Sequence, residues 1–212
     1  MAQQVSASDI APDVQADILR SKDLCEKLEH LVVGRKEFPH VGRNLLLVCL
    51  WSLFFEQHKG ALTLLSWNYP GAALALLRPI VETVVRAHVV AEGSDDDVDR
   101  IRNDKYRTNF STIGKWIDET FQMRDLFEQF LKDATRALHS YTHSGMWQIS
   151  RRFDKDGIGA NYPKDELLQL IRIAESGAFM MTILLTVKLG YQPEWEEANR
   201  LFTERAQRSA VE

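Results

Sequence analysis

Residues 45–55 read LLLVCLWSLFF, and this stretch decides the fold. Its apolar residues lie nearly all round a helix rather than along one stripe, which is typical of a helix enclosed by others. The run is too short to cross a bilayer. A longer apolar run, residues 71–90, carries Arg78, Glu82 and Arg86 near its middle, and such charges are rare inside a membrane. Both runs therefore predict core helices of a soluble protein, with no membrane segment.

Helical periodicity continues on both sides of this stretch, and no convincing alternating strand is present. Ser8 or Asp9 is expected to cap the first helix, and Pro70 suits a first helical turn. The turn at 93–97 favours a further helix start, and residues 144–163 form the longest irregular stretch. The expected helices are 8–33, 43–67, 71–92, 98–121, 123–142, 164–189 and 194–207.

These patterns predict an all-α fold, a single-core helical bundle of about six to eight helices. At 212 residues the chain suits one helical domain, residues 1–212. Within it we expect an N-terminal helix at 8–33, a bundle core at 43–190 and a C-terminal helix at 193–208. The core should come chiefly from the second, third and penultimate helices.

The charge balance argues against broad, charge-driven binding of nucleic acid, because the formal net charge is −4. Residues 100–155 nevertheless hold eleven Lys/Arg against seven Asp/Glu, a local excess of four that permits an anionic ligand. The two cysteines, Cys25 and Cys49, lie in apolar helical patterns and are expected to be buried free thiols in a reducing cytosol. No signal peptide is visible in the sequence, so a cytoplasmic protein is predicted.

The segment 136–145 reads RALHSYTHSG and is the strongest candidate for chemistry. Arg136, His139 and His143 are spaced three and four residues apart, so one face of a helix can carry all three. A permanent cation beside two groups that titrate near neutral pH suits a phosphodiester substrate. Two histidines four residues apart also suit a metal ion. The same cluster is equally compatible with an ordinary hydrogen-bonded helix end.

A second polar feature lies in the third expected helix, where Arg78, Glu82 and Arg86 recur every four residues. Charges at this spacing pair along one face of a helix, and burying them unpaired would be costly. The row is either a structural ladder of ion pairs or a polar wall that supports a site. In both cases we expect it to approach the Arg136–His143 segment.

The spacing of Arg136 and His143, with six residues between them, resembles the arginine–x(4–6)–histidine signature of HEPN-type helical ribonucleases. The resemblance implies that these two residues form the catalytic pair of a metal-independent endoribonuclease, without a cofactor, in a homodimer. It also implies a supporting charged residue on an earlier helix, a place that Glu82 or Arg78 could fill. Ala137 departs from the family, which commonly has a polar residue directly after the arginine.

The segment 139–153 also resembles uncharacterised bacterial helical proteins, some of them linked to phage defence. We therefore expect RNA as substrate, a toxin or defence role, and a controlling protein partner or antitoxin. Trp147, Arg151 and Arg152 interleave aromatic and basic side chains after the motif, which suits RNA binding, although such residues also anchor loops.

Two other functions stay open on the sequence. One is a non-catalytic helical interaction module in which both polar clusters are structural. The other is a metal-binding bundle that is similar to the DinB-like proteins, with His139 and His143 as ligands and Glu82 or another histidine as a third.

Overall fold

The computed structural model describes residues 10–34, 38–39, 41–141, 149–151, 153–154, 157–158 and 161–209, with the backbone alone at 111, 135–141, 153–154, 157–158 and 208–209. The predicted all-α bundle is confirmed. The helices are α1 (Pro12–Val33), α2 (Gly42–Ser66), α3 (Pro70–Ala75), α4 (Leu77–Glu92), α5 (Asp95–Arg102), α6 (Phe110–Phe121), α7 (Leu126–Tyr141), α9 (Lys164–Leu189) and α10 (Gln192–Ser209). Two short strands, β1 (Phe153–Asp154) and β2 (Gly157–Ile158), pair antiparallel.

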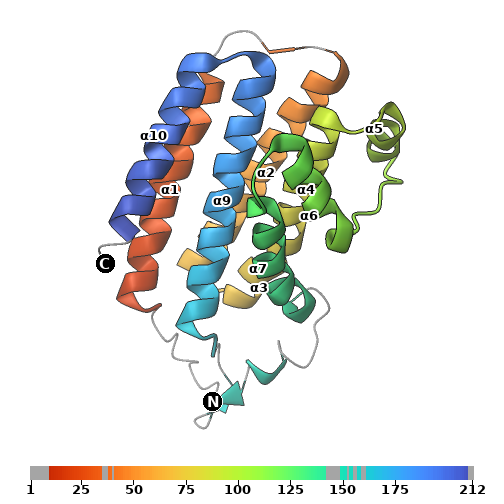
Figure 1. Ribbon diagram of the computed structural model, residues 1–212. Helices are drawn as coiled ribbons and strands as arrows, with labels where there is room; N and C mark the ends of the chain where they lie inside the picture. The colour runs from red at the N-terminus through yellow and green to blue at the C-terminus, as the bar shows by residue number, and fades with distance from the viewer. Residues whose placement is uncertain are drawn as a thin grey trace.

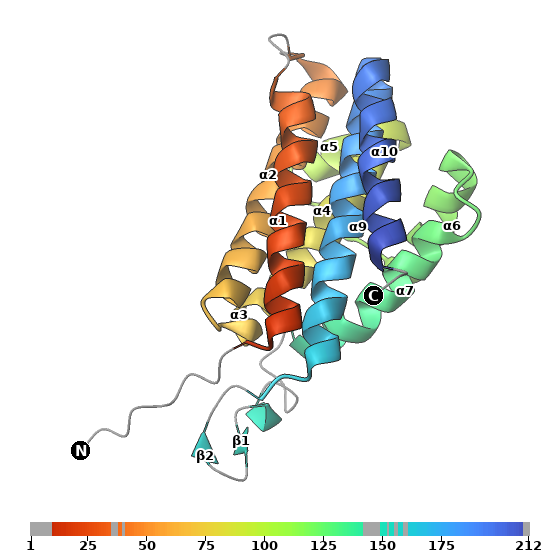
Figure 2. The same ribbon diagram turned by 90° about the vertical axis from the view of Figure 1, so that its left-hand side faces the viewer.

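The long helices lie side by side, with α2, α4 and α9 in mutual contact at the centre (Figure 1). This is the core predicted from the sequence, and α1 adds a further wall because it packs on both α2 and α9. Ile18 and Leu28 of α1 are fully buried there. Helix α10 covers α9 and α1, whereas α6 and α7 pack on one another and lie to the side of the bundle (Figure 2).

Helix α9 matches its predicted bounds, because Pro163 precedes it and Gly190 ends it in a left-handed conformation with φ 71°. By length and composition alone this helix could cross a membrane. However, 67% of its most apolar 18-residue stretch is buried inside the bundle. That burial is expected for the core helix of a soluble protein.

Gly177 lets α9 approach α2 closely. A Cβ atom added at this position would lie 2.8 Å from Cε2 of Phe54 and 3.3 Å from Cγ2 of Val84. Phe54 is fully buried, so its ring has little space in which to move.

We therefore expect Gly177→Ala to lower the free energy of unfolding by about 1–3 kcal/mol, the usual cost of overpacking a core. Gly60→Ala in α2 is the matched control, because its new Cβ would meet only Leu76 Cδ1, at 3.5 Å. That control should be neutral or stabilising, since alanine favours a helix interior. Urea unfolding of both variants measures the difference, and equal stabilities would contradict the close packing at Gly177.

Several helix boundaries differ from the prediction, and three of the differences change an expected cap or divide an expected helix. Helix α1 begins at Pro12 with Ala11 as its cap and no side-chain capping bond, so the predicted cap by Ser8 or Asp9, which lie outside the described residues, is wrong. The expected helix 71–92 is two helices separated at Leu76. Pro79 explains this break, because it has no N–H to donate to the carbonyl four residues earlier and its ring crowds that carbonyl.

The third difference lies between α5 and α6, where the sequence predicted a continuous weak helix over 98–121. Helix α5 ends at Arg102, and α6 begins only at Phe110. Asp104 has a positive φ of 54°, which a helix does not accommodate. The start of α5 is as expected, since Ser94 Oγ accepts a hydrogen bond from the backbone N–H of Asp97.

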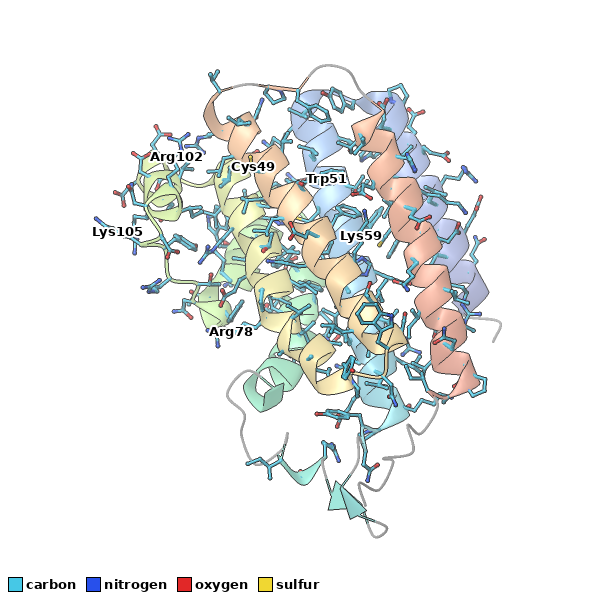
Figure 3. The ribbon with its side chains drawn as sticks, turned by 180° about the vertical axis from the view of Figure 1, so that it is seen from behind. Cys49, Trp51, Lys59, Arg78, Arg102 and Lys105 are labelled. Atoms are coloured by element: carbon cyan, nitrogen blue, oxygen red, sulfur yellow. The ribbon has the colours of Figure 1, made fainter. Side chains whose placement is uncertain are left out.

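The cysteines show that α2 is not enclosed on every side. Both thiols are free, as predicted, and Cys25 is buried, but Cys49 is exposed. Leu45 and Leu53, one turn to either side of Cys49, are exposed too. Trp51 turns inward and donates its indole N–H to Thr182 of α9 at 3.4 Å (Figure 3). The prediction of a buried Cys49 is therefore wrong, because one face of α2 lies on the surface.

Candidate functional site

Helix α7 carries the first part of the predicted motif, and its beginning is fixed firmly to the bundle. Asp118 at the end of α6 accepts the backbone N–H groups of Phe127 and Glu128 at 2.9 and 2.8 Å, which satisfies donors that a helix start leaves free. The Phe127 ring packs against His88 near the end of α4, with ring centroids 4.8 Å apart. Because α7 also contacts α3, it must run back along α4 toward α3.

The last turns of α7 therefore lie at the end of the bundle where α3, the β1–β2 hairpin and the start of α9 also gather (Figures 1 and 2). Arg136 and His139 belong to these turns, where the backbone alone is described. The remaining predicted residues His143, Trp147 and Arg152 lie outside the described residues. The structure thus places the first part of the motif near the end of a helix, at one end of the bundle.

The polar row on α4 is divided into two parts. Arg78 Nε donates to Glu82 Oε1 at 2.9 Å, and both side chains are partly exposed. Arg86 instead lies 4.0 Å from Asp104, and its buried Nε has no hydrogen-bond partner within the described part of the chain. The predicted continuous ladder is therefore one ion pair and a separate arginine. The Arg78–Glu82 pair lies in the first half of α4, which follows α3. Helix α7 runs toward this same end of the bundle.

Arg151 does not present a free cation to solvent. Its Nη2 lies 2.5 Å from Oε1 of Glu166 in the first turn of α9, and both side chains are about a quarter exposed, at 23% and 25%. This contact supports the second of the two roles considered for the residue, that of anchoring the segment after the motif.

The described residues contain one cluster of carboxylates that lie close enough together to hold a metal ion, formed by Asp118, Asp125 and Glu128. Asp118 already accepts two backbone N–H groups at the start of α7, so its burial has a structural reason. The predicted metal alternative depends on His143, outside the described residues, and on Glu82, which is bonded to Arg78.

A buried polar chain that the sequence did not reveal joins α1, α2, α9 and α10. Cys25 Sγ lies 2.8 Å from His58 Nδ1, and Ser21 Oγ lies 3.5 Å from His58 Nε2. Ser21 also bonds to Glu175, whose Oε1 accepts from Arg205 Nε at 3.2 Å. Cys25 and His58 are 33 residues apart on different helices, so no local spacing signals the contact.

Burial keeps the first members of this chain neutral. It raises the pKa of the Cys25 thiol well above its usual range and lowers the pKa of His58 to about 4. A neutral thiol can donate to His58 Nδ1, which leaves the ring hydrogen on Nε2 to donate to Ser21. His58 is 0% and Cys25 1% exposed, so no substrate reaches the pair. The thiol–histidine contact is therefore structural.

A groove with a volume of about 640 Å³ opens between α7, α9 and α10. Its apolar lining includes the stacked rings of Phe179 and Phe202, whose centroids are 4.1 Å apart. Polar groups lie among these side chains, with Asp133 on α7 and Asp165 and Arg172 on α9. The complete lining is Met123, Leu126, Gln129, Phe130, Asp133, Asp165, Gln169, Arg172, Ile173, Ser176, Phe179, Met180 and Phe202.

Residues 51–207 match the family of unknown function DUF6988. The chain belongs to this family. The DUF6988 match extends from the second half of α2 to α10 and so includes the α4 ion pair, the whole of α7 and the groove. No curated protein and no solved structure matches the chain. Membership of DUF6988 assigns no function to the chain, because the function of the family is unknown.

Proposed function

We propose that this protein is a metal-independent endoribonuclease of HEPN-like type. The observation that carries the proposal is the position of Arg136 and His139 in the last turns of α7, within an all-α bundle and at the end where the Arg78–Glu82 pair of α4 lies. A helix that terminates at the end of a bundle can be accessible to a large substrate such as RNA. We further propose a cytoplasmic homodimer that acts as a toxin or defence effector.

In the proposed reaction His143 removes the proton of the ribose 2′-hydroxyl or protonates the leaving oxygen, since an imidazole can do either near neutral pH. Arg136 stabilises the negative charge that develops on the phosphorus oxygens. His139 and the Arg78–Glu82 pair have supporting roles, because a fixed ion pair can orient a neighbouring cation.

RNA cleavage by the purified protein tests this proposal directly. We expect cleavage of single-stranded RNA with EDTA present, and a loss of at least about 100-fold in Arg136→Ala and in His143→Ala, as for removal of an acid–base group. His30→Ala, an exposed histidine of α1, is the matched control and should cleave like the wild type. Intact RNA under all conditions, or full cleavage by both variants, would contradict the proposal.

The groove between α7, α9 and α10 favours a second candidate function, a non-catalytic module that binds a protein partner. In that case the polar clusters serve stability alone. Glu82→Ala would then lower the thermal stability of the protein, and the wild type would leave every RNA intact.

A further inference from the structure

Two aromatic side chains are held open to solvent in the turn between α2 and α3. Trp67 is 69% and Tyr69 57% exposed. Asn68 between them has a positive φ of 59°, and the backbone N–H groups of Asn68 and Tyr69 donate to Leu65 and Leu64 at 2.9 and 2.8 Å. Pro70 then begins α3. The turn is thus fixed by backbone hydrogen bonds, while neither aromatic ring packs on another ring in the described part of the chain.

A cation is bound at the residue that precedes this pair. Lys22 of α1 donates from Nζ to Ser66 Oγ at 2.9 Å, and Ser66 directly precedes Trp67. The Ser66 hydroxyl in turn donates to the carbonyl of Leu62 at 2.8 Å, which fixes its orientation. Among the residues that the structure describes, no carboxylate forms an ion pair with Lys22. The Lys22 ammonium is therefore held at the end of α2, on the residue that directly precedes Trp67.

The turn that carries Trp67 and Tyr69 lies at the end of the bundle toward which α7 runs. Tyr69 directly precedes α3, and α3 contacts both α7 and α9 (Figure 1). Arg78, near the start of α4, is also partly exposed, but it lies on the side of the bundle away from α1 (Figure 3). The aromatic pair thus shares one end of the molecule with the last turns of α7, to which Arg136 and His139 belong.

We propose that Trp67, Tyr69 and Lys22 form a platform for single-stranded RNA, on which unpaired bases stack and which holds the adjacent phosphate. This inference rests on the proposed ribonuclease function and adds its substrate class. Exposed aromatic rings are sequence-tolerant stacking surfaces for unpaired bases, whereas bases within a duplex are already stacked. The net charge of −4 disfavours broad binding of RNA, so a local platform of this kind would supply the affinity.

Binding of a fluorescently labelled single-stranded oligoribonucleotide tests the platform. The assay uses the full chain with His143→Ala as background, so that the RNA stays intact. We expect Trp67→Ala and Tyr69→Ala each to weaken binding about 5- to 100-fold, the usual effect of losing one stacked base. Trp67→Phe should retain most of the affinity. Lys22→Gln should weaken binding and reduce its dependence on salt.

Val187→Ala is the matched control, because Val187 is 56% exposed but lies near the last residue of α9, whereas the start of α9 lies at the end of the bundle that carries the platform. It should bind RNA like the background protein, and thermal unfolding should show that all variants are folded. Unchanged RNA affinity in Trp67→Ala and Tyr69→Ala overturns the inference. So does a fall in molecular mass in those variants without loss of RNA binding, which would assign the surface to contact between copies of the chain.

The two proposals fail separately. If the wild type cleaves RNA and the Trp67 and Tyr69 variants bind and cleave it equally well, the platform is wrong and the ribonuclease stands. If single-stranded RNA binds through Trp67 and Tyr69 but is never cleaved, the ribonuclease is wrong and the platform stands. A duplex of the same sequence that binds as tightly as the single strand would also contradict the platform.

Discussion

Replacement of Arg205 by methionine is expected to lower the free energy of unfolding by about 3–5 kcal/mol, as when one partner of a buried ion pair is removed. Arg205 Nε donates to Glu175 Oε1 at 3.2 Å, and its Nη2 donates to Asp17 Oδ1 at 3.0 Å. The Glu175 side chain is only 8% exposed. Without the guanidinium, this buried carboxylate loses its counter-charge and keeps its hydrogen bond to Ser21. Urea unfolding at pH 7 measures the loss.

Arg200→Met is the matched control on the same helix. Arg200 pairs with Glu197 and Glu204 at the surface, where such pairs contribute less than about 1 kcal/mol. The double variant Glu175→Gln with Arg205→Met should recover much of the stability, because no buried charge is left unpaired. If Arg205→Met lowers the free energy of unfolding no more than Arg200→Met does, the buried ion pair does not stabilise the packing of α10.

The cost of Arg205→Met should also depend on pH. Burial raises the pKa of Glu175, and the nearby Arg205 lowers it in part. Removal of the arginine therefore raises this pKa further, so that the folded variant binds a proton that the unfolded chain releases. The stability of the variant relative to the wild type should accordingly fall as pH rises above the unfolded pKa, and improve in acid.

Mild acid is expected to destabilise the wild-type protein through two buried histidines. Burial lowers the pKa of both His58 and His88 from 6.5 to about 4. Between these values the unfolded chain binds a proton that the folded chain excludes, so stability falls as pH falls from 6.5 toward 4. The free energy of unfolding should decrease by about 2 kcal/mol for each histidine between pH 7 and pH 5.

His88→Leu isolates half of this effect. The His88 ring packs against Phe121 and Phe127, and Nδ1 bonds only to the carbonyl of Val84, so leucine removes the proton site without leaving a buried donor unpaired. The difference in stability between variant and wild type should change by about 2 kcal/mol between pH 7 and pH 5. His30→Gln, at an exposed position of α1, should leave the slope unchanged. If the free energy of unfolding of His88→Leu and that of the wild type depend on pH in the same way, His88 is not one of the groups that destabilise the protein in acid.

Local sequence signals were sufficient for much of the fold. Helix α9 could be placed to the residue because Pro163 and Gly190 mark its ends. Pro70 begins α3 as its position suggested, whereas Pro79 divides the expected third helix at Leu76, although the apolar periodicity continues through it. The apolar content of α2 predicted its central place but not its exposed face at Cys49, because composition does not tell which side lacks a neighbour.

The candidate site was only partly predictable. Spacing along one helix revealed the Arg78–Glu82 pair and the Arg136 segment, since residues four apart share a face. The Cys25–His58 contact joins two different helices, and the Glu175–Arg205 pair joins residues 30 apart. Such contacts depend on how helices pack, which no local pattern encodes. Trp67 and Tyr69 were missed for a similar reason, because their exposure follows from the turn after α2.

The buried attachment of α10 bears on how the protein unfolds. An outer helix held by apolar contacts alone can detach in steps, since each residue that leaves costs little. Helix α10 is also held by Arg205, which pairs with Glu175 of α9 and Asp17 of α1, so its detachment breaks two largely buried ion pairs. Opening of α10 should therefore cost more free energy than fraying, and it links the stability of this helix to the contact between α1 and α9.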